Sequence, residues 1–194
     1  MSHPFLAAHL QPNMGGSAFL NPEHLMDAGG VRLGHHVADI GTGRTGHLVF
    51  PLATRVGSEG KVYAVDIDSE AVSMVESLRR TRGTHNLHTV WSDVESPGSV
   101  NVPAGSLDVA FLVNTLWTIK RHGSLVQELS RLMNDAGRIL VMDWHESASH
   151  PLAPRVDFRQ QPRVVDVYFA EANWHPVYEV RITPHHWARA YERL

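Results

Sequence analysis

Val37-Ala38-Asp39-Ile40-Gly41-Thr42-Gly43-Arg44-Thr45-Gly46 is the stretch that decides the predicted fold of this chain. Its first four residues are an apolar run with one acid, typical of a buried strand, and its glycines indicate a tight turn into a helix. A backbone without Cβ atoms can take positive φ and lets a ligand approach closely. The amides that open the helix add a local positive end. The stretch therefore predicts a binding site at the end of a strand.

A second strand supplies an acid at an informative distance. Lys61 to Asp66 is apolar between its charged ends, and its final carboxylate comes about 20 residues after Gly46, the separation at which an acid receives ribose hydroxyls. The glycine turn and Asp66 together predict a nucleoside-binding site.

Two classes of nucleoside fit the glycine spacing. Gly41, Gly43 and Gly46 satisfy the dinucleotide pattern G-x-G-x-x-G, so an NAD(P)-binding Rossmann oxidoreductase is one alternative. Asp39 argues against it, because a carboxylate beside a pyrophosphate places like charges together in a partly dry site. The same carboxylate suits a ligand with an ammonium and a sulfonium. S-adenosylmethionine is such a ligand.

Five segments, in order, resemble the motifs of class I S-adenosylmethionine-dependent methyltransferases, in particular the ubiquinone/menaquinone-type and type 11 enzymes. They are Asp39 to Gly43, Val65 to Asp68, Ser92 to Val94, Leu107 to Phe111 and Asn134 to Leu140. The resemblance covers roughly residues 20–194. One of these motifs alone is weak, but five in sequence are specific.

The resemblance implies an α/β fold: a Rossmann-like, seven-stranded, mostly parallel sheet with strand order 3-2-1-4-5-7-6, helices on both faces and an antiparallel last strand. Residues 21–194 would form a single methyltransferase domain and residues 1–20 an N-terminal arm. Apolar residues in this arm leave two interpretations open. The arm is either a loosely packed terminus or a lid over cofactor and substrate.

The resemblance also implies which residues contact the cofactor. They are Asp39, Gly41, Thr42, Gly43, Asp66, Ile67, Asp93, Val94 and Asn114. The glycine turn with Asp39 would hold the methionyl part, and Asp66 the ribose. Asp93 would receive the adenine amino group, with Ile67 and Val94 on the faces of the ring.

Asn114 opens the segment after the fourth expected strand, where an open α/β sheet binds its ligands. Asn114-Thr115-Leu116-Trp117 lacks both prolines of the Asn/Asp-Pro-Pro-Tyr/Phe signature that supports methylation of amino groups in nucleic acids. Asn114 could bond the cofactor or orient the substrate. His145, after the fifth strand, is the candidate general base. The alternative is an ordinary loop histidine, because many methyltransferases need no base.

Composition and net charge limit the kinds of substrate, metal and compartment expected for this chain. The chain has 194 residues, a net charge of −3 and no cysteine. This net charge gives no overall positive field to attract a phosphate backbone, so nucleic acid is disfavoured as a substrate. Without cysteine there are no disulfides or thiolate sites. The histidines are scattered, so no metal site is expected. No targeting or membrane segment is visible, and the cytoplasm is the expected compartment.

Periodicity and turn residues also predict several boundaries. A helix is expected from His47 to Val56 with Pro51 inside it, where it costs a hydrogen bond unless it falls in the first turn. Gly137 should close the helix that carries Leu125, Leu129 and Leu132, before a strand from Arg138 to Asp143. Residues 147–162 are expected to be a polar linker. A helix from Val164 to Ala172 and strands from Val177 to Thr183 and His186 to Leu194 complete the prediction.

The sequence thus predicts transfer of a methyl group from S-adenosylmethionine to a small molecule. Two alternatives stay open: a non-catalytic domain that binds S-adenosylmethionine and regulates or supports a partner, and the nicotinamide enzyme. The first remains because no residue is demonstrably catalytic and a fold does not imply a function.

Overall fold

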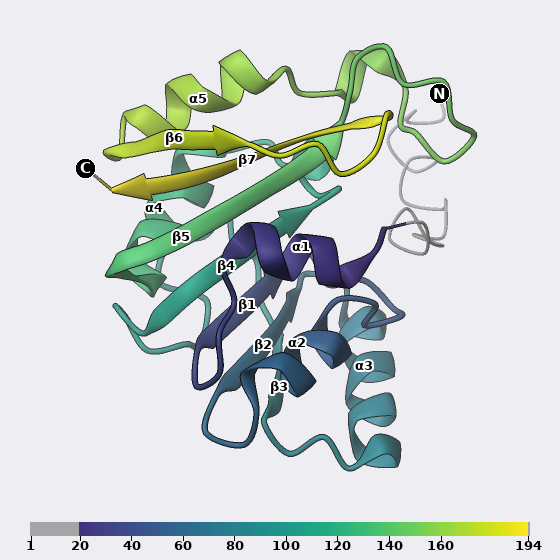
Figure 1. The fold of residues 1–194 in the computed structure, drawn as a ribbon, viewed down its shortest axis with the longest axis vertical. Helices are drawn as coiled ribbons and strands as arrows, with labels where there is room; N and C mark the ends of the chain where they lie inside the picture. Colours follow the sequence, from purple (N-terminus) through teal and green to yellow (C-terminus); the bar gives the residue numbers. More distant parts are fainter. Residues whose placement is uncertain (1–19, 194) are drawn as a thin grey trace, which may run out of the picture.

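The computed structural model describes residues 20–193, which form one seven-stranded sheet in the order β3-β2-β1-β4-β5-β7-β6 (Figure 1). The strands are β1 His36–Ile40, β2 Lys61–Asp66, β3 Leu87–Trp91, β4 Leu107–Val113, β5 Met133–Trp144, β6 Trp174–Glu179 and β7 His186–Arg193. Strands β1 to β5 pair in parallel, and β7 is antiparallel to both β5 and β6. The predicted strand order and antiparallel last strand are confirmed. The predicted arm lies outside the described residues, apart from Leu20.

Helices cover both faces of the sheet, as predicted. They are α1 Pro22–Gly29, α2 Val49–Val56, α3 Ser69–Arg82, α4 His122–Leu132 and α5 Pro162–Ala170, with the 3-10 turns η3 Leu116–Thr118 and η4 Val156–Phe158. Apolar residues of α1, α2 and α3 share one core cluster, and those of α4 and α5 share the other. In Figure 1, α1 crosses in front of the middle of the sheet and α4 lies behind it.

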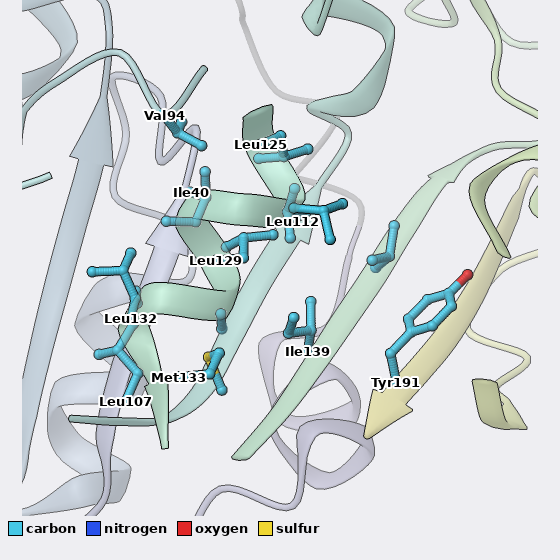
Figure 2. Close-up of a cluster of buried hydrophobic side chains, with 14 of the residues drawn as sticks. Ile40, Val94, Leu107, Leu112, Leu125, Leu129, Leu132, Met133, Ile139 and Tyr191 are labelled. Carbon is cyan, nitrogen blue, oxygen red and sulfur yellow. The ribbon is translucent and has the colours of Figure 1, made fainter. Parts of the chain in front are cut away.

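The central strands are apolar on both faces because both faces are covered. In β1, Val37 faces the cluster of α1 and α2, whereas Ala38 and Ile40 face that of α4 and α5. Figure 2 shows the second cluster, in which the leucines of α4 pack against β1, β4 and β5. Its labelled residues are Ile40, Val94, Leu107, Leu112, Leu125, Leu129, Leu132, Met133, Ile139 and Tyr191.

The helix after the glycine turn begins two residues later than predicted. Residues 47 and 48 belong to the turn, and α2 starts at Val49. Pro51 therefore occupies the first turn of α2, where a backbone N–H has no partner within the helix in any case. Because the helix starts later than predicted, Pro51 causes no loss of a helical hydrogen bond.

Elements in the second half have bounds that differ from prediction. Gly137 does not close a helix, because α4 ends at Leu132 and β5 begins at Met133, which pairs with Leu107 of β4. The predicted helix 164–172 is α5, which starts earlier because Pro162 occupies its first position. The predicted strand 177–183 is β6, which starts at the fully buried Trp174. Burial of that indole, a long-range effect, sets the start of the strand.

Candidate functional site

The glycine turn packs tightly against the ends of two other strands. Gly41 and Gly43 have φ of 77° and 65°, which glycine adopts without strain. The N–H of Gly41 donates to the carbonyl of Val65, at 2.8 Å. A Cβ on Gly41 would lie 2.5 Å from Thr115 Oγ1. Only glycine therefore fits between the ends of β2 and β4.

Asp66, at the end of β2, holds this turn in place. Its Oδ2 accepts the N–H of Gly43 at 2.8 Å, and its Oδ1 accepts the N–H of Asp68 at 2.9 Å. The acid expected to receive the ribose thus also orders the glycine turn and the start of α3. Each carboxylate oxygen keeps a further lone pair for a ligand.

Asp39 is a buried acid with no neutralising cation among the described residues. Its side chain lies in β1 and only 4% of the residue is exposed. Burial raises the pKa of Asp39 to about 7, and the charge of Asp66 acts in the same direction. The Thr42 hydroxyl partly lowers this pKa, although Thr42 Oγ1 lies outside hydrogen-bond geometry. The site therefore holds an acid that an added cation would ionise.

A pocket opens at this edge of the sheet. Its empty space is about 510 Å³, including the part open to solvent. The lining residues are Leu20, Leu25, Asp39, Gly41, Thr42, Gly43, Thr45, His47, Leu48, Val113 and Asn114. They come from α1 and the residue Leu20 before it, from β1, from the end of β4 and the residue after it, and from the turn into α2. Polar and apolar groups therefore meet where parallel sheets bind ligands.

Asn114 stands out in this pocket. Its φ is 57°, a conformation uncommon for residues other than glycine. Its side-chain Oδ1 and Nδ2 are buried with no hydrogen-bond partner, like Thr42 Oγ1. Unpartnered buried polar atoms are costly. These three atoms therefore form a polar lining that a bound ligand would satisfy.

The residues predicted to hold adenine lie outside this pocket. Asp93 follows β3, and its carboxylate accepts the N–H of Glu95 at 2.8 Å and pairs with Arg121 at 3.1 Å. Val94 is buried, whereas Ile67 is 65% exposed. The structure thus gathers Asp39, the turn and Asn114 around one pocket and leaves the other set along the neighbouring strand ends.

His145 follows β5 and is exposed. Its Nδ1 lies 3.2 Å from Ser147 Oγ, and it does not line the pocket. His47 does line it, and its Nε2 lies 2.7 Å from the carbonyl oxygen of Leu20. Sequence reasoning did not single out His47, although its place directly after the glycine turn was a usable signal.

Residues 20–193 contain neither a metal-binding cluster nor a membrane-spanning helix. In that part of the chain, histidine, aspartate and glutamate form no group of three or more that could hold a metal ion. No helix there has the length and apolar character needed to cross a membrane.

Comparisons with known proteins agree on one family. A family model described as a methyltransferase domain matches residues 33–180. Aklanonic acid methyltransferase DauC of Streptomyces sp. (strain C5) is 33% identical over 126 residues, covering 60% of this chain and 56% of that protein. The ubiquinone/menaquinone biosynthesis C-methyltransferase UbiE of Idiomarina loihiensis is 28% identical over 136 residues, covering 70% and 53%. The chain thus spans little more than half the length of these curated relatives.

The fold has close counterparts among solved structures. The crystal structure of an S-adenosylmethionine-dependent methyltransferase from Aquifex aeolicus matches with a TM-score of 0.82 and 20% identity, covering 98% of each chain. This chain therefore belongs to the methyltransferase-domain family and has the fold of S-adenosylmethionine-dependent methyltransferases.

Proposed function

We propose that this chain binds S-adenosylmethionine in the pocket at the glycine turn and transfers its methyl group to a small organic acceptor. The observation that carries the proposal is Asp39, a buried carboxyl group that lines the pocket with the glycine turn and has no cation of the described residues to pair with it. A pyrophosphate there would meet a like charge, whereas an ammonium or sulfonium would meet an opposite one.

The pocket fits the proposed cofactor in three respects. Glycines at 41 and 43 let a ligand approach the main chain. Asn114 offers a donor and an acceptor that are buried and unused. Asp39 supplies the negative charge for the amino-acid end of the ligand. These features support a methionyl subsite formed by Asp39, Thr42, Asn114 and the glycine turn.

The ribose and adenine subsites are proposed at the neighbouring strand ends. Asp66 would receive the ribose hydroxyls while it keeps the N–H of Gly43. Ile67 and Val94 would contact the adenine faces. Asp93 would receive the amino group while paired with Arg121, since a carboxylate accepts several hydrogen bonds at once.

The chemistry asked of the chain is chiefly alignment. When bound, S-adenosylmethionine supplies an electrophilic methyl group. The chain holds donor and acceptor in one geometry, and such positioning contributes on the order of 7 to 11 kcal/mol. His145, which follows β5 and is exposed, is the proposed general base.

The names of the relatives support a small organic acceptor. DauC is named for aklanonic acid and UbiE for ubiquinone and menaquinone. We extend only the class to this chain: an organic acceptor methylated at carbon, oxygen or nitrogen. Turnover of any acceptor would exclude the alternative of a purely binding domain.

The test is calorimetric titration with S-adenosylmethionine, S-adenosylhomocysteine and NAD in parallel. We expect micromolar binding of the first two and none of NAD. Asp66→Asn should weaken S-adenosylhomocysteine binding by about 1 to 3 kcal/mol, because one part-buried acceptor is lost. Asp108→Asn, at the opposite end of β4, is the control, since Asp108 accepts the N–H of His36 and touches none of these subsites. Tight NAD binding with no heat from S-adenosylmethionine would overturn the proposal.

A further inference from the structure

Asp143, the penultimate residue of β5, is a fully buried acid. Its exposed fraction is 0%. Its Oδ2 accepts the N–H of Leu116 at 2.8 Å, and its Oδ1 accepts the N–H of Trp144 at 2.7 Å. No ion pair within residues 20–193 includes it, and burial raises its pKa to about 7. An acid so costly to bury needs a role that an apolar side chain could not fill.

The segment that Asp143 contacts is the one that carries Asn114 into the pocket. The N–H of Asn114 donates to the carbonyl of Met142 at 2.8 Å. Thr115 Oγ1 donates to the carbonyl of Ile40 at 3.0 Å. Leu116 then donates to Asp143. Residues 114–116 are thus fixed at three successive points to the ends of β5 and β1.

These contacts explain how Asn114 keeps an unfavourable backbone conformation. A positive φ at a residue other than glycine persists only where the surroundings hold it. The Asn114 contact joins two main-chain groups, which any sequence offers. The other two contacts each need a side chain, the hydroxyl of Thr115 and the carboxylate of Asp143. Asp143 is therefore the residue of this sequence on which the position of the Leu116 N–H depends.

We propose that Asp143 is a positioning residue for the cofactor pocket. Its carboxylate fixes the N–H of Leu116, keeps residues 114–117 in place and so holds the Asn114 amide at the pocket and Thr115 against Gly41. The cofactor part of this inference rests on the proposed function. The effect on residues 114–117 does not.

The surroundings of Asp143 make its hydrogen bonds hard to replace. In β7 the residue paired with it is the buried Trp187. The titratable groups nearby are Tyr168 of α5, whose pKa is raised by burial and by the charges of Asp143 and Asp166, and His122 of α4, which stacks on Tyr168 with ring centroids 4.6 Å apart. The hydroxyl of Tyr168 and Nε2 of His122 are buried without hydrogen-bond partners. Neither the Tyr168 hydroxyl nor Nε2 of His122 donates a hydrogen bond to Asp143.

The experiment compares Asp143→Leu, which removes both acceptors, with Asp143→Asn, which keeps one. Nuclear magnetic resonance of the ligand-free protein would follow the Leu116 amide and the Trp117 indole, whose Nε1 donates to the carbonyl of Asn114 at 3.0 Å. Calorimetry would give S-adenosylhomocysteine affinity. Asp108→Asn is the matched control, because Asp108 also accepts a strand N–H, from His36 at 2.7 Å, at the opposite end of the sheet.

We expect Asp143→Leu to move both resonances and to weaken S-adenosylhomocysteine binding about tenfold, a loss typical of one misplaced hydrogen-bonding group. Asp143→Asn should recover part of the affinity, and Asp108→Asn should leave the resonances and affinity unchanged. If Asp143→Leu does not fold, the two resonances and the S-adenosylhomocysteine affinity are measured on Asp143→Asn instead, and these values test the proposal.

Two outcomes would overturn the inference: resonances and affinity that do not change in a folded Asp143 variant, or changes of the same size in Asp108→Asn. If the resonances move but the unsubstituted protein binds no S-adenosylhomocysteine, the positioning role stands and the proposed function fails. The two claims are therefore separable.

Discussion

The carboxyl group of Asp39 is buried, and folding therefore disfavours its ionised form. Its pKa is raised from the ordinary value of 3.8 to about 7, so between these pH values the folded chain keeps a proton that the unfolded chain releases. Stability therefore falls as pH rises through this window. One pKa unit corresponds to about 1.4 kcal/mol, so the loss amounts to several kcal/mol at most.

We predict that Asp39→Asn removes this loss. The free energy of unfolding of the variant, relative to that of the unsubstituted protein, should increase from pH 5 to pH 8. Urea denaturation at both pH values measures it. Asp143 shares the shift but is present in both proteins, so its contribution cancels. A difference that does not change with pH would show that Asp39 ionises normally in the folded chain.

Comparing Gly41 with Gly34 separates the effect of close packing against Thr115 from the effect of backbone strain. Both have positive φ, 77° and 82°, but a Cβ on Gly41 would meet Thr115 whereas one on Gly34 would meet nothing within 4 Å. We predict that Gly34→Ala costs about 1 to 2 kcal/mol from backbone strain alone. Gly41→Ala should cost about 1 to 3 kcal/mol more, from overpacking. Equal costs in urea denaturation would mean that Thr115 moves aside freely.

Helix α4 carries a buried acid that ties it to a distant loop. Glu128 is 0% exposed, and its carboxylate accepts the N–H groups of Gly98 at 2.6 Å and Val100 at 3.1 Å and pairs with Arg131. Although burial alone would raise the pKa of Glu128, these hydrogen bonds lower it below its ordinary value. The loop between β3 and β4 thus depends on one charge in an otherwise apolar helix face.

We predict that Glu128→Gln lowers the free energy of unfolding by about 2 to 3 kcal/mol, because hydrogen bonds to a buried charge are lost. The contribution of Glu128 is present above pH 4.5, its ordinary pKa, and is lost as pH falls through the lowered value of the folded state. Denaturation at pH 7 and pH 3 checks both statements. Glu70→Gln, in an exposed ion pair with Arg44, is the control and should cost under about 1 kcal/mol.

The segment after β5 is ordered by one arginine. The guanidinium of Arg159 donates to the carbonyls of Glu146 and Ala148, each at 2.8 Å, and to that of Pro154 at 2.8 Å. The sequence predicts a polar linker over residues 147–162, but the structure places η4 within it and begins α5 at Pro162. The contacts of Arg159 show that this linker has a defined shape.

Ligand binding should stabilise the whole domain, because a ligand that binds only the folded state shifts the equilibrium by mass action. S-adenosylhomocysteine at 100 times its Kd should contribute about 2.7 kcal/mol. For a chain of this size that corresponds to a rise in Tm of about 5 to 11 °C. Thermal unfolding with and without ligand measures it, and NAD at equal concentration is the control. An equal rise in Tm with NAD would indicate that the glycine turn binds a dinucleotide.

Local sequence determined most of the architecture. Apolar runs, glycine turns and helix caps are set by neighbouring residues, so the strands and helices could be predicted locally, whereas the strand order and the helices on both faces were implied by the resemblance to the methyltransferase family. Asn21 caps α1 by accepting the N–H of Glu23 at 3.0 Å, as its place before Pro22 predicts. Asp39, the glycine turn and Asp66 could be proposed as site residues from sequence because they stand at or beside the ends of apolar strand-length runs.

Only the tertiary structure decided which distant groups meet. Leu116 and Asp143 are 27 positions apart, and Thr115 and Ile40 are 75 apart; no local pattern pairs them. The start of β6 at Trp174 and the burial of Glu128 have the same origin, because each depends on what the rest of the chain packs against it. Periodicity reports which face of an element is buried, whereas a buried polar side chain is explained only by the partner that folding brings to it.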